Sequence, residues 1–476
     1  MRRWGGFAFG TIVLLAAPAA AAAQARTCDL IQPADYRRIT NARGESVWYF
    51  RDPVRLRCTG DVTLAADSAV YNPIQAALEL VGAVAYRDST TQLTSQWANY
   101  LGRTEQLLAR GNVVLRNLED GSVVTGQELQ YLRQSPARRT SHVVIRGGRP
   151  RAVLRNAPAP APGGAPAVPP RGDDGAAPLE VTADRLEFIG DTLFLARGRV
   201  ELERGATTGA SDSARYSEPT ERMTLLGRAH VRDERYRLEG QRIDAFVQGD
   251  ALREVRAQVR TRLVSEELTV ESERLRIGFV AGALERLEAW NPPPPGAADT
   301  AGAGRERALA LAEGFRLRAD SIDAVADSGR LREVRAVGRG YGERPLDSLA
   351  VGLPAAVARD WIQGDTIIGY FAAIPAADTV AAAGDSTEIV LERVVVIGGS
   401  GPALSLYRVD AEREGERGAI NFMKARRIIL FMTGGEVARV EAEGPLDGVY
   451  LDPVGGRGSG PSPPAVRTGA AAGGAT

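Results

Sequence analysis

Five aspartates recur at one position of a repeated pattern, and their type and spacing could support chemistry. They are Asp67, Asp184, Asp212, Asp320 and Asp365. Two carboxylates that flank a glycosidic bond can cleave it, one as general acid and the other as base or nucleophile. That reaction needs a single pair, whereas these residues recur along most of the chain. We therefore expect structural roles, in which they accept backbone N–H bonds or pair with a neighbouring arginine, as Asp184 would with Arg185.

Histidine and cysteine are too scarce for most other catalytic sites. The chain has two histidines, His142 and His230, and two cysteines, Cys28 and Cys58. A zinc site needs about four ligands, and these four residues lack metal-ligand spacing. No Gly-x-Ser-x-Gly nucleophile elbow is present either. We expect no enzymatic activity, no metal and no cofactor, and we expect Cys28 and Cys58 to form a disulfide if the protein is exported.

Charge and the N-terminal segment restrict the environment of the protein. The 476 residues carry 59 basic and 59 acidic side chains, so the net charge is zero. Binding to nucleic acid relies on excess positive charge, and we therefore expect no such partner. Residues 1–25 combine Arg2 and Arg3, an apolar stretch and the small-residue site Ala23-Gln24-Ala25. This arrangement predicts a cleaved secretory signal peptide, with a retained anchor helix as the alternative.

An eight-residue pattern repeats through the chain: apolar, any, small, acidic or Gln, any, apolar or Ala, any, Tyr or apolar. Its copies begin at residues 64, 93, 124, 181, 209, 238, 270, 317 and 362, with a tenth at 423 that has Arg426 in place of the acid. A second half-motif containing glycine follows most copies. Each half has period two, which predicts β-hairpins with strands of roughly 7–10 residues. One hairpin cannot bury its own apolar face, so the hairpins must stack into an antiparallel β-array.

Segments rich in proline, glycine and alanine interrupt this array, because their composition cannot bury enough apolar surface to form a core. They predict three blocks. The divisions are a signal peptide at 1–25, block 1 at 26–154, a linker at 155–178, block 2 at 179–290, a linker at 291–314, block 3 with insertions at 315–452, and a disordered tail at 453–476. A short helix is predicted over residues 305–313.

The repeat resembles the OstA-like/LptA family of lipopolysaccharide-transport proteins. Segments Val62–Asp67 and Ala109–Leu115, together with residues 426–450, carry the resemblance, which extends over roughly residues 45–452 apart from the linkers. It implies an all-β fold, an open, curved β-jellyroll whose groove holds the acyl chains of lipopolysaccharide. It also implies a non-enzymatic conduit that stacks end to end between the inner and outer membranes. This chain is longer than a one-domain bridge component and is divided by linkers.

From the resemblance we expect a periplasmic protein, with association with the outer membrane left open. It would bind lipopolysaccharide or a related glycolipid, and it would contact other envelope-transport components or further copies of itself through edge strands. Two other classes stay open: a structural β-repeat scaffold or adhesin of the envelope with a closed core, and, less favoured, a polysaccharide-active β-helix enzyme.

The recurrent apolar positions are the candidates for lining a lipid groove. They are Leu64, Val70, Leu80, Val84, Leu107, Val113, Leu115, Leu129, Leu186, Phe188, Leu193, Leu195, Val200, Leu225 and Val231. The same alternation would fill a closed core, so the sequence does not decide between groove and core. Arg110, Arg197 and Arg228 lie beside the repeated glycine and could bind phosphate, although solvated strand ends would look alike.

Overall fold

The computed structural model describes most of the repeat region. The described residues are 28–31, 35–58, 61–135, 137–155, 177–248, 251–265, 268–292, 306–312, 315–327, 330–345, 359–375, 387–409, 419–434, 436–451 and 467–468. The predicted signal peptide lies outside them, and so does the predicted tail apart from Arg467–Thr468. The chain divides into two compact units, Met1–Leu118 with Glu128–Val143, and Glu119–Gln127 with Val144–Thr476.

Strands make up nearly all of the described chain. The early strands are β1 (Cys28–Leu30), β2 (Asp35–Thr40), β3 (Ser46–Arg51), β4 (Val54–Cys58), β5 (Val62–Ala66), β6 (Ser68–Asn72), β7 (Ala77–Arg87), β8 (Thr91–Leu101), β9 (Gln106–Asn117), β10 (Val123–Leu132) and β11 (His142–Arg146). Next come β12 (Arg151–Leu154), β13 (Leu179–Thr182), β14 (Arg185–Ile189), β15 (Leu193–Arg204), β16 (Thr207–Ser217), the 3-10 turn η1 (Glu218–Thr220), β17 (Arg222–Arg232), β18 (Tyr236–Gln248), β19 (Ala251–Ser265), β20 (Thr269–Val280), β21 (Ala283–Trp290) and β22 (Ala308–Ala312). The last are β23 (Phe315–Ala319), β24 (Ser321–Asp327), β25 (Arg330–Pro345), β26 (Arg359–Pro375), β27 (Thr387–Ile397), β28 (Ala403–Val409), β29 (Ala419–Ala425), β30 (Arg427–Thr433), β31 (Glu436–Glu443), β32 (Asp447–Leu451) and β33 (Arg467–Thr468).

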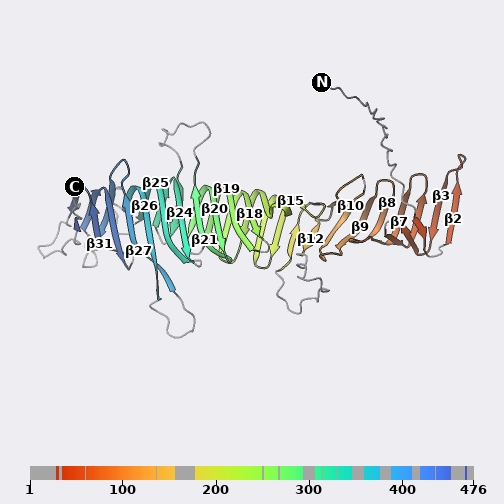
Figure 1. The fold of residues 1–476 in the computed structure, drawn as a ribbon, viewed down its shortest axis with the longest axis horizontal. Coiled ribbons are helices and arrows are strands. Elements are labelled where there is room, and N and C mark those ends of the chain that lie inside the picture. The colour runs from red at the N-terminus through yellow and green to blue at the C-terminus, as the bar shows by residue number, and fades with distance from the viewer. Residues whose placement is uncertain are drawn as a thin grey trace, which may run out of the picture. The chain divides into compact units, whose positions relative to one another are not determined.

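Long strands bend in the middle and so belong to two layers, which we call arms A and B. In the second unit, β13 pairs with Glu201–Glu203 of β15, whereas β14 pairs with Leu193–Arg197 of the same strand. Between these halves the register shifts, because a β-bulge places two residues opposite one. Arm A contains the half beside β13, and arm B contains the half beside β14. In Figure 1 the labelled strands from β15 through β18–β21 to β24–β27 follow one another in chain order along the second unit.

The core of each unit lies between its two arms. In β7 of the first unit, Leu78 and Leu80 on one side of the bulge and Val84 and Tyr86 on the other are all buried, with relative exposures of 2% or less. The residues between them, such as Glu79, are more exposed. Side chains alternate between the two faces of a strand, so both halves of β7 turn one apolar face towards the same interior.

The small residue of the repeated pattern lies on the inner side of the bend, which we call the corner. Ala66, Ala183 and Ala319 are each at most 4% exposed there. At Gly364, a Cβ atom would lie 2.6 Å from the carbonyl oxygen of Ile397. The arms converge at the corner and leave no space for a larger side chain, which explains why this position is small in every copy of the pattern.

Buried serines at the corner complete the hydrogen bonding of the bent backbone. The Oγ atoms of Ser95, Ser211 and Ser272 each donate to the carbonyl two residues further on, at 2.8 to 3.0 Å. A bulge interrupts the regular ladder, and a buried carbonyl without a partner would cost free energy. The serines therefore satisfy groups that the bend takes out of strand pairing.

The prediction of an all-β fold of stacked antiparallel strands is confirmed. The strands are longer than predicted, for example 16 residues in β25, because the glycine of the second half-motif, here Gly338, lies within the strand at the bulge and does not end it. Within the helix predicted over residues 305–313, the described segment Ala308–Ala312 instead forms strand β22, which pairs with β20. Its Ala-Leu alternation suits a strand with one buried face.

The proline-rich segments do not divide the sheet into three blocks. Strands β12 and β13, on either side of the predicted linker 155–178, pair directly through Leu154 and Leu179. Likewise β20 pairs with β22 across the start of the predicted linker 291–314. The division between the compact units falls instead near β10 and β11. Because strand pairing continues past them, these segments are insertions within an array.

Candidate functional site

Most of the described corners carry a contact between an acidic or amide side chain and a glycine. We call this repeated contact the corner ladder. Gly198 lies within the bulge of β15 with a φ of +79°, and the Cβ of any larger residue would collide with Asp184. Gly338 repeats this arrangement against Asp320, with a φ of +78°. Only glycine adopts such a conformation without strain. The repeated aspartates are therefore structural at these corners.

Arginines that follow the glycines complete the corner ladder. Arg199, Arg228 and Arg339 form ion pairs at 2.5 Å with Asp184, Asp212 and Asp320 respectively. The hydrogen bond from Arg199 lowers the pKa of the Asp184 carboxyl. The first two pairs are exposed and contribute little to stability, whereas the third, Arg339 with Asp320, is half-buried.

The structure assigns other partners to several residues singled out in the sequence. Asp184 pairs with Arg199, whereas the predicted partner Arg185 pairs with Glu187. Arg228 is engaged by Asp212, and the guanidinium of Arg110 lies 5.4 Å from the ring centroid of Trp97. Cys28 and Cys58 form a disulfide that joins β1 to β4.

A buried polar cluster in the first unit surrounds Asp88. Its carboxylate accepts hydrogen bonds from the hydroxyls of Tyr86 at 2.8 Å and Tyr131 at 3.3 Å, and it pairs with Arg133 at 3.2 Å. Burial, with the adjacent Asp88, raises the pKa of Tyr131 to about 12, and that of Tyr86 is raised as well. Both hydroxyls thus stay protonated and can donate, which indicates a structural network.

Most of the apolar residues predicted to line a groove face the interior. The buried ones are Leu64, Leu80, Val84, Leu107, Val113, Leu115, Leu129, Leu186, Val200 and Leu225. Phe188 and Val231 are partly buried, and the ring of Phe188 lies 5.0 Å from that of buried Phe194. These side chains pack against one another in the described chain, so whether they line a lipid groove stays a prediction.

Val70, Leu193 and Leu195 lie on the opposite face of their strands. Val70 pairs with Glu79, and Leu195 pairs with Glu187, while the neighbouring residues Phe194 and Ala196 are the buried ones. These strands have apolar residues on both faces, so the sequence pattern does not show which set of alternate residues faces the interior. These three residues do not belong to the interior surface.

Towards the C-terminus of the second unit, the two arms enclose an apolar cavity of about 30 Å³. Phe315, Ile362 and Tyr407 line it from arm A, and Val394 and Leu430 line it from arm B. At the edge of the cavity, Asp360 pairs with Arg344 at 3.3 Å, and burial raises the pKa of this carboxyl.

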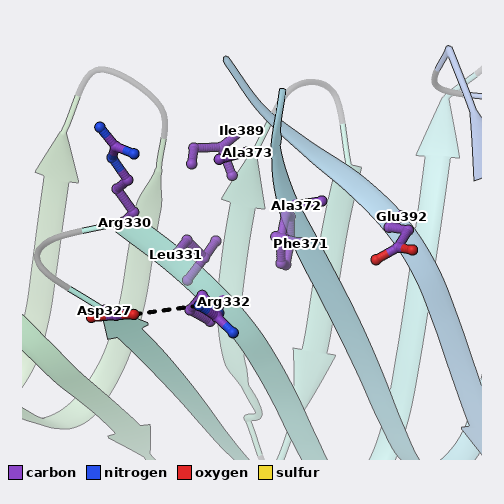
Figure 2. A pocket seen from close by; sticks show the side chains of 9 residues that line it. All are labelled: Asp327, Arg330, Leu331, Arg332, Phe371, Ala372, Ala373, Ile389 and Glu392. Atoms are coloured by element: carbon purple, nitrogen blue, oxygen red, sulfur yellow. Dashed lines mark hydrogen bonds and ion pairs between the residues drawn. The ribbon is translucent and has the colours of Figure 1, made fainter. Parts of the chain in front are cut away.

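A larger cleft, of about 540 Å³, lies at those ends of the arm B strands that are farther from the corner (Figure 2). We call it the rim cleft. Its lining residues are Asp327, Arg330, Leu331, Arg332, Phe371, Ala372, Ala373, Ile389 and Glu392. They come from the end of β24, from the start of β25 and from the hairpin of β26 and β27. The register places Phe371 and Ala373 on the same face of β26 as the buried Ile367.

Among the described residues, no group of three or more His, Cys, Asp or Glu side chains is arranged to hold a metal ion. In the same part of the chain, no helix has the length and apolar character needed to cross a membrane. The fold and the site define an all-β protein of bent, stacked strands with an apolar interior and a ladder of structural acids at the corner.

No protein-family model matches this chain, and neither does any curated protein. Among solved structures, it is similar to the crystal structure of LptH from Pseudomonas aeruginosa, described as the LptA homologous periplasmic component of the conserved lipopolysaccharide transport device. The two chains are 18% identical over a match that covers 29% of this chain and 96% of LptH, with a TM-score of 0.23.

Sequence reasoning missed the cavity and the rim cleft. Their residues belong to β23–β31, where the copies of the repeated pattern are weakest. The one available signal was the alternation in Thr387–Ile397, which predicts a strand but does not show that its hairpin extends beyond its neighbours.

Proposed function

We propose that this protein binds the acyl chains of a lipopolysaccharide-like glycolipid between its two arms and serves as a non-enzymatic conduit in the periplasm. The apolar cavity between the arms in the second unit carries this proposal, because both arms contribute aliphatic or aromatic side chains to it. Apolar ligand sites in proteins are lined in this way, with a few polar groups that fix orientation. Arg344 and Asp360 are such groups here.

Binding requires the arms to separate, because the cavity of about 30 Å³ is far below the roughly 300–1,000 Å³ of typical ligand sites. The described strands that pass from one arm to the other do so at the corner, where the bulges lie. Away from the corner the buried side chains of the two arms pack together, and such packing can rearrange without breaking strand pairing. Acyl chains would then replace contacts between the inner faces of the two arms.

Photo-crosslinking in living cells tests the proposal with a matched pair of positions on β30. Leu430 faces the cavity, and its neighbour Ile429 packs in a separate cluster with Ile368 and Val395 on the outer face. Both are buried, at 4% and 9% exposure, so packing alone does not distinguish them. We expect glycolipid adducts from a photoreactive residue at 430 and none from one at 429. Equal labelling, or none at either, would contradict the proposal.

The structural scaffold remains a second candidate, and one observation favours it. Leu80 and Leu186 are fully buried at 0% exposure, so side chains already fill the interior around these two residues. Photoreactive residues at these two positions would then join only to neighbouring strands. Lipid adducts at position 430 together with protein-only adducts at 80 and 186 would confine lipid binding to the end of the array near β30.

A further inference from the structure

The hairpin of β26 and β27 extends beyond the strands on both sides of it. Pairing of β25 with β26 ends at Glu333 and Tyr370, although β26 continues to Pro375. Pairing of β27 with β30 ends at Arg393 and Phe431, although β27 begins at Thr387. We call Phe371–Pro375 together with Thr387–Glu392 the projecting hairpin. Its two strands pair with each other, from Phe371 with Leu391 to Pro375 with Thr387.

The rim cleft lies along the free edge of this hairpin. Among the described residues, no strand pairs with the β25 side of Phe371–Pro375. Arg330–Arg332 of β25 lie across the cleft (Figure 2) and pair through Arg330 and Leu331 with β24. An edge of this kind presents a row of backbone donors and acceptors, which another extended chain can satisfy.

The side chains along the cleft alternate in a way that suits a strand. Phe371 and Ala373 lie on the inner face and Ala372 on the outer face of β26, as their pairing with β27 shows. Leu331 and Ile389 add apolar surface. Arg330 and Glu392 place opposite charges on the two sides of the cleft, as Figure 2 shows. Arg332 is engaged by Asp327 at 3.3 Å, which leaves Arg330 to meet an incoming carboxylate.

We propose that the rim cleft binds an extended segment of a partner protein, which adds to the free edge of β26 as an antiparallel strand. The segment carries apolar side chains at alternate positions and an acidic residue beside Arg330. Backbone hydrogen bonds supply affinity and the alternate pockets supply selectivity, as in other cases of strand addition. This interaction goes beyond lipid binding and does not depend on it.

A labelled peptide of alternating valine and threonine that ends in glutamate is the probe. Its binding to the full chain is followed by fluorescence anisotropy, and amide hydrogen exchange is followed over residues 371–375. We expect saturable binding and slower exchange in this segment. An analogue N-methylated at alternate residues cannot donate to the edge, so we expect it to bind at least tenfold more weakly.

Charge reversal provides the matched variants. Arg330 is exposed, so Arg330→Glu should leave the fold intact. We expect it to weaken binding of the acidic peptide several-fold and to favour a peptide that ends in lysine. Tyr370→Ala, at the preceding position on the outer face, is the control and should bind as wild type does, whereas Phe371→Ala should bind more weakly.

Three outcomes would overturn the proposal. Equal binding of the N-methylated analogue would show that the backbone edge is not used. Absence of slower exchange in 371–375 at saturating peptide would place the peptide elsewhere. Protection of this segment by vesicles of anionic phospholipid, with none by peptide, would make the cleft a lipid-surface site. None of these results bears on crosslinking from position 430, so the two proposals fail separately.

Discussion

At the scale of the residue, the corner ladder determines which positions tolerate a side chain. Gly338 and Gly282 share a φ of +78°, but they differ in surroundings. A Cβ at Gly338 would lie 2.5 Å from Oδ2 of Asp320, whereas no atom lies within 4 Å of a Cβ at Gly282. Comparing the same substitution at these two glycines therefore separates the strain of a left-handed backbone from the added contact with the aspartate.

We predict that Gly338→Ala destabilises the protein more than Gly282→Ala does. Both substitutions incur roughly 1–2 kcal/mol of left-handed strain. Gly338→Ala also displaces Asp320 and disrupts its ion pair with Arg339. Urea unfolding measures the difference. Combining Gly338→Ala with Asp320→Ala should remove the extra cost, and equal destabilisation by the two single variants would contradict a structural role for the aspartate.

A second prediction concerns a buried carboxylate on the outer face of arm A. Glu343 is 2% exposed and accepts hydrogen bonds from Arg359 at 2.6 Å and Arg316 at 3.0 Å. Burial alone would raise its pKa, but these hydrogen bonds lower it below the ordinary value of 4.5. Because the folded-state pKa is the lower one, ionised Glu343 stabilises the fold above about pH 4.5. That contribution is lost as the pH falls through the folded-state pKa.

Glu343→Gln should therefore lower the free energy of unfolding by about 1–3 kcal/mol at pH 7. The difference from wild type should shrink steadily below pH 4.5. Urea unfolding across this range is the measurement, with exposed Glu285→Gln as the control that should match wild type throughout. A difference that stays constant with pH would mean that the charge of Glu343 does not contribute.

The sequence predicted the inner face wherever only one face of a strand is apolar. Leu186 and Val200 each lie between two charged neighbours, and both are buried as expected. The prediction for Leu193 and Leu195 was wrong because Phe194 between them is apolar as well. Phe194 is the residue that faces the interior, so its two neighbours lie on the other face. The ion pair of Asp184 with Arg199 joins the bend between β13 and β14 to strand β15, and a local pattern cannot reveal it.

At the scale of the element, the proline-rich segments are insertions between strands that already meet. Leu154 and Leu179 lie directly opposite each other in β12 and β13. Composition showed where such segments lie, but it could not show that the flanking strands pair, because pairing is a long-range interaction. Because a two-residue turn joins directly opposed residues of two antiparallel strands, such a turn fits between Leu154 and Leu179.

Replacing residues 155–178 with Asn-Gly should therefore preserve the fold. The described contacts that would be lost are the hydrogen bonds from the Arg155 amide to Ser122 and from Arg204 to the carbonyl of Ala177. We expect the thermal unfolding midpoint, followed by circular dichroism, to fall by only a few degrees. Extending the deletion through Leu179–Thr182 removes strand β13 and should lower it sharply. Unfolding caused by the shorter deletion would show that the segment is part of the core.

At the scale of the whole molecule, an array of stacked strands must end in unpaired edges. In the first unit, β2 pairs with β3, and Tyr36 and Ile39 on β2 are 55% and 45% exposed. In the second unit, β32 pairs with β29, and Val449 and Leu451 are 51% and 55% exposed. No other described strand covers the far edge of β2 or β32. Exposed apolar side chains beside free backbone favour pairing with another chain.

We therefore predict concentration-dependent self-association that depends on these terminal strands. Sedimentation velocity should show a weight-average coefficient that rises with protein concentration. Val449→Lys with Leu451→Lys should suppress the rise, because charge on an edge strand opposes pairing with a second sheet. Leu226→Lys is the control: Leu226 is 40% exposed, but β17 is paired on both sides, so adding charge there should change nothing. If the wild-type coefficient does not rise with concentration, or if the Leu226 variant alone suppresses the rise, association through the edges of β2 and β32 is excluded.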